Sequence, residues 1–229
     1  NPTYSHNGQF FTFNNVSVAP KPFQHPHPPL YAAVRSESSV AFAAKHGLRY
    51  MTGVTGNTDQ NLDQLNHYVD MMSQHNHSVD LSHIPFFRYV YVGETEDQVR
   101  QDTEAPMMWV WDCLDWQVSE GIRTGLGLDE WLRSPRTPSV SYDEIYDKVA
   151  FFGTPDQVLN QIIALRDQGV GHFGGSFAFG GQEPAKVTKS ETSRVHEGLT
   201  TRSASWSKAS SAPNARKGFR ASAEYRSKS

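Results

Sequence analysis

Two serines, Ser36 and Ser39, are the side chains whose placement in this sequence most favours chemistry. They follow the apolar run of residues 29–34, which predicts a buried strand, and they open a segment with helical spacing. Free N–H groups at a helix N-terminus, together with hydroxyl groups, form a binding site for an anion such as a phosphate. The same residues are also common helix caps, which is a purely structural role, and both interpretations remain open here. The neighbouring Arg35 either adds a cationic contact to an anion or lies in solvent.

The ten histidines of the chain suggest a metal site, but their spacing is a weak signal for one. His25 and His27 lie in a proline-rich segment, His75 and His77 lie near a predicted helix end, and no convergent carboxylate pair accompanies either set. We therefore expect no bound metal. His172 lies on the last predicted strand, where a buried or hydrogen-bonded role is favoured over a place at a site. The sequence contains no nucleophile elbow, P-loop or dinucleotide-binding glycine motif.

The elements that must position these groups alternate between strand and helix patterns. The predicted strands lie near residues 29–34, 50–54, 85–92 and 172–179, and the predicted helices cover residues 36–46, 58–74, 95–117 and 154–168. Such alternation indicates parallel strands joined by crossover helices. A closed eight-stranded barrel needs about 250 residues, so four strands predict half a barrel or a small open sheet. The tryptophan-rich insertion of residues 109–146 is interpreted as an outer helix core rather than as the lining of an apolar pocket.

Composition separates an acidic body from a basic tail. Residues 1–181 carry 11 Lys/Arg and 20 Asp/Glu, whereas residues 182–229 carry 10 Lys/Arg and 4 Asp/Glu together with 10 serines. We expect residues 1–184 to form one domain and residues 185–229 to be disordered, because the tail has too little apolar surface to offset the entropy of ordering. The acidic body argues against a nucleic-acid partner. No apolar run is long enough for a membrane span, and a lone cysteine, Cys113, favours a cytoplasmic location.

Several separate blocks of the sequence resemble the luciferase-like flavin monooxygenases. The stretch from Gly8 to Pro29 (GQFFTFNNVSVAPKPFQHPHPP) resembles the family's mid-chain segment, and Ala33–Gly47 (AVRSESSVAFAAKHG) resembles its strand-to-helix turn. Gly153–Val158 (GTPDQV) and Ser176–Gly181 (SFAFGG) resemble its C-terminal signatures. The blocks occur in the family's order and cover roughly residues 7–185, whereas the tail matches none of them.

This resemblance implies a TIM-barrel-like α/β fold, of which the chain holds the second half, from the fifth strand to the eighth. The first half of such proteins normally carries the catalytic histidine, so the resemblance assigns no catalytic residue in this sequence. It implies a flavin-dependent monooxygenase in which reduced FMN reacts with oxygen and an apolar substrate such as an aldehyde or ketone is oxygenated. A flavin reductase is the implied electron donor, and a deazaflavin-dependent oxidoreductase is the nearest alternative.

The resemblance also assigns cofactor-binding residues. It places the flavin phosphate at the turn after the first predicted strand, which supports Ser36 and Ser39 directly and adds Arg35. The residues expected to face the flavin ring lie at strand ends and are Ala33, Val34, Met51 and Val54. A non-catalytic flavin-binding or structural homologue remains an alternative to the enzyme. The exposed edges of half a barrel also predict that the chain associates with a second copy.

Overall fold

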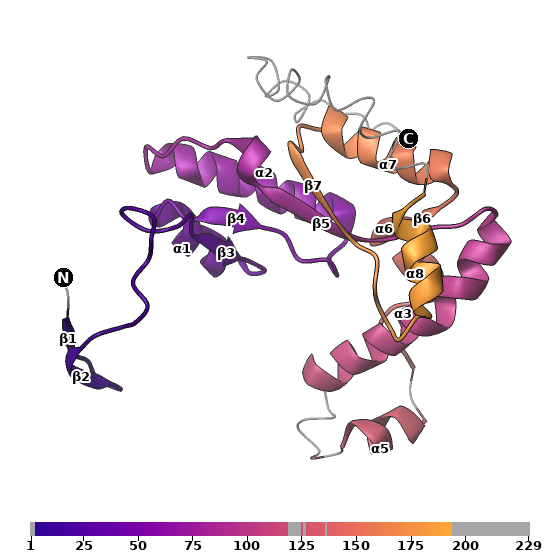
Figure 1. The fold of residues 1–229 in the computed structure, drawn as a ribbon, viewed down its shortest axis with the longest axis horizontal. Helices are drawn as coiled ribbons and strands as arrows, with labels where there is room; N and C mark the ends of the chain where they lie inside the picture. The colour runs from indigo at the N-terminus through magenta and orange to yellow at the C-terminus, as the bar shows by residue number, and fades with distance from the viewer. Residues whose placement is uncertain (1–2, 119–124, 126, 136, 194–229) are drawn as a thin grey trace. The chain divides into compact units, whose positions relative to one another are not determined.

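A computed structural model describes residues 3–118, 125, 127–135 and 137–193. Its contacts divide the chain into a small unit that ends at Leu30 and a larger unit that begins at Tyr31. The small unit contains one antiparallel hairpin, formed by β1 (Tyr4–Asn7) and β2 (Thr12–Val16) (Figure 1). Every residue of both strands is exposed, so no buried face produced an alternating pattern from which the sequence could have predicted them.

The larger unit is built on parallel strands. They are β3 (Tyr31–Ala33), β4 (Arg49–Met51), β5 (Pro85–Val92), β6 (Phe151–Gly153) and β7 (His172–Ser176). β3 pairs with β4, and β5 lies between β6 and β7. The Thr52 side chain links the two sheets, because its Oγ1 accepts a hydrogen bond of 2.7 Å from the Phe87 N–H. The four predicted strands are therefore present, although the second ends at Met51 and the last at Ser176.

Strand β6 was not predicted from the sequence. It has three residues, too few for a period-2 pattern, and it exists because it pairs with the last three residues of β5. The predicted insertion of residues 109–146 contains the end of one long helix, one short helix and the start of another. Trp111 in this region is buried, as an outer core requires, whereas Trp109 is 48% exposed.

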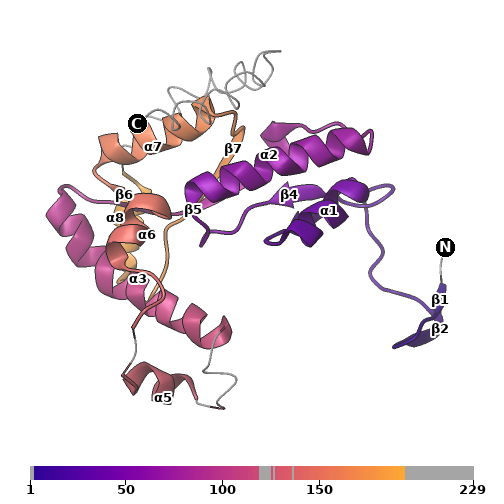
Figure 2. The ribbon, with the colours of Figure 1, turned by 180° about the vertical axis from the view of Figure 1, so that it is seen from behind.

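Seven α-helices are described in the larger unit (Figures 1 and 2). They are α1 (Glu37–Lys45), α2 (Thr58–Gln74), α3 (Glu96–Val118), α5 (Leu128–Arg133), α6 (Tyr142–Lys148), α7 (Pro155–Asp167) and α8 (Pro184–Glu191), with a 3-10 turn at Leu81–His83. The predicted start of α7 is confirmed, because Thr154 and Gln157 form a capping box and Pro155 occupies the first turn. Gly169 ends this helix with a φ of +93°. Among the described residues, no helix has both the length and the apolar character that crossing a membrane requires.

Two hydrophobic clusters form the core of the larger unit. The first joins α1, α2 and α7 to one face of the strands, with Tyr50, Phe86 and Val90 fully buried. Successive strand residues point to opposite faces. The neighbouring Tyr31, Ala33, Arg49 and Met51 therefore lie on the other face of β3 and β4, where all four remain exposed or half-buried; we call this set the open face.

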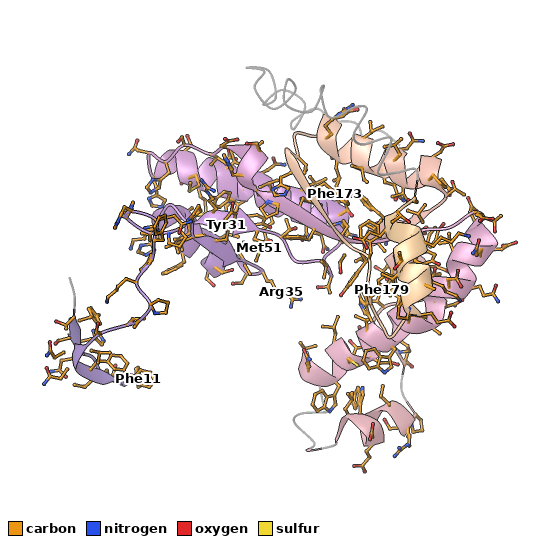
Figure 3. All side chains as sticks on the ribbon, viewed as in Figure 1. Phe11, Tyr31, Arg35, Met51, Phe173 and Phe179 are labelled. Atoms are coloured by element: carbon orange, nitrogen blue, oxygen red, sulfur yellow. The ribbon has the colours of Figure 1, made fainter. Side chains whose placement is uncertain are left out.

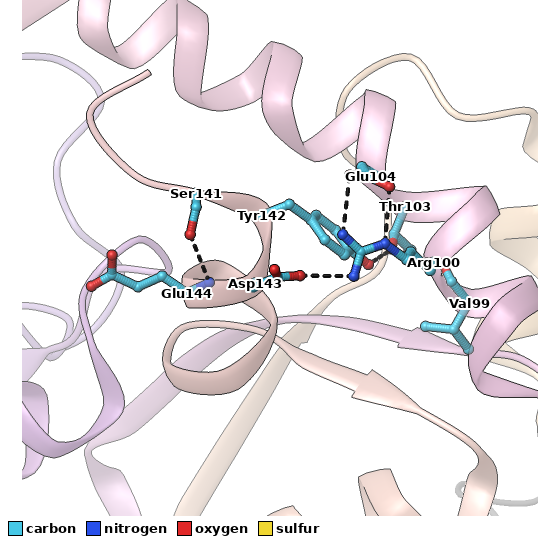
Figure 4. A network of polar contacts seen from close by, with 8 residues as sticks. All are labelled: Val99, Arg100, Thr103, Glu104, Ser141, Tyr142, Asp143 and Glu144. Carbon is cyan, nitrogen blue, oxygen red and sulfur yellow. Dashed lines mark hydrogen bonds and ion pairs between the residues drawn. The ribbon is translucent and has the colours of Figure 1, made fainter. Parts of the chain in front are cut away.

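The second cluster joins α3 and α6 to the end of β5, and a polar network closes its outer side (Figure 4). Arg100 of α3 forms an ion pair of 2.7 Å with Asp143 of α6 and one of 3.1 Å with Glu104. Beneath it, the Tyr142 hydroxyl lies 2.6 Å from the Thr103 hydroxyl. Because Arg100 and its carboxylates are largely exposed, the buried hydroxyl pair contributes more to the packing of these helices than the ion pairs do.

Helix α8, apart from its first residue, lies within the segment of residues 185–229 that the composition predicts to be disordered. Its buried Ser190 accepts a hydrogen bond of 2.8 Å from the Val92 N–H of β5. Lys186 forms an ion pair of 2.6 Å with Asp102, which is itself nearly buried. These contacts hold α8 against β5 and α3, although the composition of this segment provides too little apolar surface to order it by itself. The rest of the predicted tail, residues 194–229, lies outside the described residues.

Candidate functional site

The turn from β3 into α1 holds both predicted serines in a reciprocal cap. Ser36 is the N-cap residue, and its hydroxyl accepts a hydrogen bond of 3.3 Å from the Ser39 N–H. In return, the Ser39 hydroxyl accepts a hydrogen bond of 3.0 Å from the Ser36 N–H. The structural interpretation of these serines is therefore confirmed: their hydroxyls hold the backbone of the turn.

The capped turn still leaves donors for an anion. The N–H groups of Glu37 and Ser38 occupy the first two positions of α1, and neither has a hydrogen-bond acceptor among the described residues. The Arg35 side chain beside them is exposed and forms no ion pair within the described part of the chain (Figure 3). The helix dipole adds positive potential at the same point. The exposed Glu37 carboxylate opposes an anion, so the turn can hold one only if this side chain points into solvent.

The strand ends beside this turn carry the apolar residues that were predicted to face a ring. Strand register places Ala33 of β3 directly opposite Met51 of β4, both on the open face. Val54 lies half-buried in the loop that follows β4. Val34 does not join them: it is 3% exposed and packs in the first core cluster, behind the strands. The prediction that its side chain faces a ring is wrong, because Val34 has the opposite orientation to Ala33 along the chain.

Two further residues on the open face were missed by sequence reasoning. Tyr31 and Arg49 lie opposite each other in the register of β3 and β4. Arg49 Nη1 donates a hydrogen bond of 3.1 Å to the Tyr31 hydroxyl, and the guanidinium carbon lies 5.6 Å from the centre of the Tyr31 ring. They precede the strand ends, so they border the candidate site on its amino-terminal side. Only the pairing register could have revealed them, since 17 residues separate them in the chain.

His172 does not lie at this site. His172 is exposed at the first residue of β7, at the amino end of the strand, whereas Ala33 and Met51 lie at carboxyl ends. Of the buried or hydrogen-bonded role expected for His172, the buried one is therefore wrong. Since β7 runs parallel to β5, His172 also lies at the end of its sheet opposite to the carboxyl ends of these two strands. Within the residues that the structure describes, His, Cys, Asp and Glu form no group of three that could hold a metal.

Comparison with known proteins decides the family. Residues 1–172 match the family described as luciferase-like monooxygenase. The chain belongs to this family. The match covers the capped turn, the open face and the hairpin, and it confirms the resemblance that the sequence blocks indicated.

Two curated relatives are oxygenases. The oxygenase component of a flavin-dependent trigonelline monooxygenase from Acinetobacter baylyi is 27% identical over 97 residues, which are 42% of this chain and 27% of the relative. An FMNH2-dependent dimethylsulfone monooxygenase from Pseudomonas putida is 25% identical over 177 residues, which are 73% of this chain and 46% of the relative. The chain therefore spans less than half the length of these relatives.

Solved structures agree on the fold. The monooxygenase RslO1 from Streptomyces bottropensis superposes with a TM-score of 0.64 at 19% identity, covering 88% of this chain and 56% of that one. The oxygenating constituent of 3,6-diketocamphane monooxygenase from Pseudomonas putida, solved in complex with FMN, gives a TM-score of 0.53 at 16% identity. It covers 82% of this chain and 55% of that one. The predicted luciferase-like α/β fold with parallel strands is thus confirmed.

Proposed function

We propose that this chain supplies the phosphate-binding turn and one wall of the ring site of an FMN-dependent monooxygenase. One observation carries this proposal: the unpaired N–H groups at the start of α1 lie directly after β3, beside the Ala33–Met51 pair. An anion site therefore adjoins an apolar strand end, which is the combination that a flavin nucleotide needs. The names of the relatives, both of them flavin-dependent oxygenases, agree with this chemistry.

The donor set fits a phosphate in kind. The N–H groups of Glu37 and Ser38 donate along the helix axis, and the exposed guanidinium of Arg35 can add two parallel hydrogen bonds. The resemblance implies that Ser36 and Ser39 contact the phosphate, and their hydroxyls also hold the turn that presents these donors. We assign them a positioning role at the phosphate.

Ala33, Met51 and Val54 supply apolar contacts to the ring and exclude water from that side. The flavin itself, once reduced, supplies the reaction with molecular oxygen. A small apolar substrate, a flavin reductase as electron donor and a cytoplasmic location complete the proposal. A deazaflavin is the alternative cofactor. The family resemblance places the proton-transferring histidine in the part of the relatives' length that this chain does not span.

A flavin titration tests the phosphate site. The chain is titrated with FMN, with riboflavin and, without oxygen, with reduced FMN, and flavin fluorescence or absorbance reports binding. We expect FMN to bind more tightly than riboflavin, because only FMN has a phosphate. Arg35→Gln should reduce the preference for FMN over riboflavin, measured as the ratio of their dissociation constants, roughly tenfold. Lys45→Gln, at the other end of α1, should leave this ratio unchanged. Equal binding of FMN and riboflavin by the unchanged chain contradicts the phosphate site.

Flavin binding without catalysis is the second candidate function, because the contacts assigned above hold the flavin and none of them transfers a proton. Oxygen consumption with reduced FMN and a substrate separates the two, since both functions require flavin binding and only the enzyme turns over. Association with a second copy is part of either proposal, because β3 pairs with β4 alone among the described strands and leaves one edge free. Sedimentation velocity should reveal a concentration-dependent dimer, and a compact monomer at all concentrations contradicts it.

A further inference from the structure

Arg88 is the largest fully buried side chain described in the structure, and its charge has no anionic partner there. It lies in the middle of β5 and is 0% exposed. On the same face of the strand, Phe86 and Val90 fill the equivalent positions with apolar groups. Among the described residues, no carboxylate lies within ion-pair distance of the guanidinium. Burial lowers the pKa of Arg88 to about 9, which still leaves the group protonated at neutral pH.

Neutral oxygens surround the charge instead, and most of them belong to one neighbouring segment. Nη1 lies 3.4 Å from the carbonyl oxygen of Gly53, and Nε donates a hydrogen bond of 3.1 Å to the Thr58 hydroxyl. With its oxygen toward Arg88, the Asn61 amide accepts from Nη1 at 3.0 Å and from Nη2 at 3.2 Å. Only the Phe87 carbonyl, at 2.7 Å, comes from β5 itself. We call Arg88 with Gly53, Thr58 and Asn61 the Arg88 clamp.

The clamp spans the loop between β4 and α2, from the residue that follows Thr52 to the first turn of α2. This loop has no regular hydrogen-bond ladder of its own and contains Gly53 and Gly56, so its backbone needs outside partners. Thr52 fixes its start through the hydrogen bond from the Phe87 N–H. The clamp connects β5 to the Gly53 carbonyl and to the first turn of α2, at the two ends of the loop. Because an isolated buried charge is unfavourable, Arg88 depends on these hydrogen bonds, on the Phe87 carbonyl and on the Phe86 ring, whose centre lies 4.2 Å from the guanidinium carbon.

We propose that Arg88 is a positioning residue, which holds the β4–α2 loop so that Met51 and Val54 are presented to the flavin ring. This inference rests on the proposed function, since Met51 and Val54 are the ring contacts assigned there. Its physical basis is preorganisation: a loop held before the ligand arrives does not lose entropy when the ligand binds. A planar guanidinium can reach all three loop partners at once, whereas a lysine ammonium is a single point with three donors.

The test compares Arg88→Lys with Arg166→Lys, a control in which the arginine of α7 forms an ion pair with its neighbour Asp167. Hydrogen exchange of the flavin-free chain is followed in residues 52–61 and in α7, and the dissociation constant of FMN is measured for each variant. We expect Arg88→Lys to speed exchange in residues 52–61 at least tenfold, with α7 unchanged, and to weaken FMN binding about tenfold. The control should change neither quantity.

Every other outcome of these two measurements contradicts one part of the proposal. Unchanged exchange in residues 52–61 shows that Arg88 does not hold the loop. Faster exchange with unchanged FMN binding limits Arg88 to a stabilising role. If the unchanged chain binds no FMN, the proposed function fails and the ring-presenting role fails with it, while exchange still decides whether the loop is held. Should Arg88→Lys not fold, Thr58→Val removes one acceptor, leaves Arg88 in place and is expected to cause the same two changes at smaller size.

Discussion

Removing the Ser190 hydroxyl tests whether α8 belongs to the folded domain. Ser190 is 1% exposed, and its Oγ accepts a hydrogen bond of 2.8 Å from the Val92 N–H. Val92 is the last residue of β5 and lies beyond Tyr89, where the pairing of β5 with β7 ends. Ser190→Ala therefore leaves a buried backbone donor without a partner, while the helix keeps its length and packing.

The size of the effect follows from two opposing terms. A buried N–H without a partner costs about 1–3 kcal/mol. Alanine has a higher helix propensity than serine, which returns roughly 0.5 kcal/mol. We therefore expect Ser190→Ala to lower the free energy of unfolding by about 1–2 kcal/mol.

Urea unfolding followed by circular dichroism measures this loss. With an m-value of about 2 kcal/mol per molar, the midpoint should fall by roughly 0.5–1 M. Thr188→Ala is the matched control, because Thr188 is exposed on the same helix and its hydroxyl donates only to the Pro184 carbonyl one turn earlier. The control should shift the midpoint little or raise it. Equal midpoints for the two variants refute the reasoning, since they imply that α8 does not dock on β5.

Two further predictions concern the same region. Gly180 and Gly181 both have positive φ, +58° and +72°, but a Cβ at Gly180 lies 2.0 Å from the Pro106 carbonyl oxygen and one at Gly181 meets nothing within 4 Å. Gly180→Ala should therefore lower the melting temperature clearly more than Gly181→Ala, and equal losses contradict this packing. For Asp102, burial raises the pKa, but hydrogen bonds from Lys186 and a tyrosine outweigh it and lower the pKa overall. The ionised Asp102 therefore stabilises the fold above its pKa in the unfolded chain, and this stabilisation is lost as the pH falls through its pKa in the folded chain. Lys186→Met removes the ion pair, so it should move the midpoint of acid unfolding to higher pH. An unchanged midpoint contradicts a stabilising ion pair.

Local signals in the sequence were sufficient wherever one segment contains all the groups that decide its structure. The capping box of Thr154 and Gln157 and the apolar stripe of residues 58–74 placed two helices correctly, because caps and helical faces depend on residues three or four apart. The same holds for the turn at Ser36, whose hydrogen bonds all lie within a few residues. The blocks that resemble luciferase-like monooxygenases identified the family for a similar reason.

Tertiary contacts decided the rest. β6 and α8 exist because β5 offers them partners from 60 or more residues away, and neither carries a pattern that marks it in the sequence. The orientation of Val34 into the core, and the pairing of Tyr31 with Arg49, depend on strand register, which a three-residue strand does not encode. In the sequence, nothing distinguishes Arg88 from an ordinary strand residue. Its importance appears only when the β4–α2 loop brings oxygens to a charge that no nearby residue in the chain could neutralise.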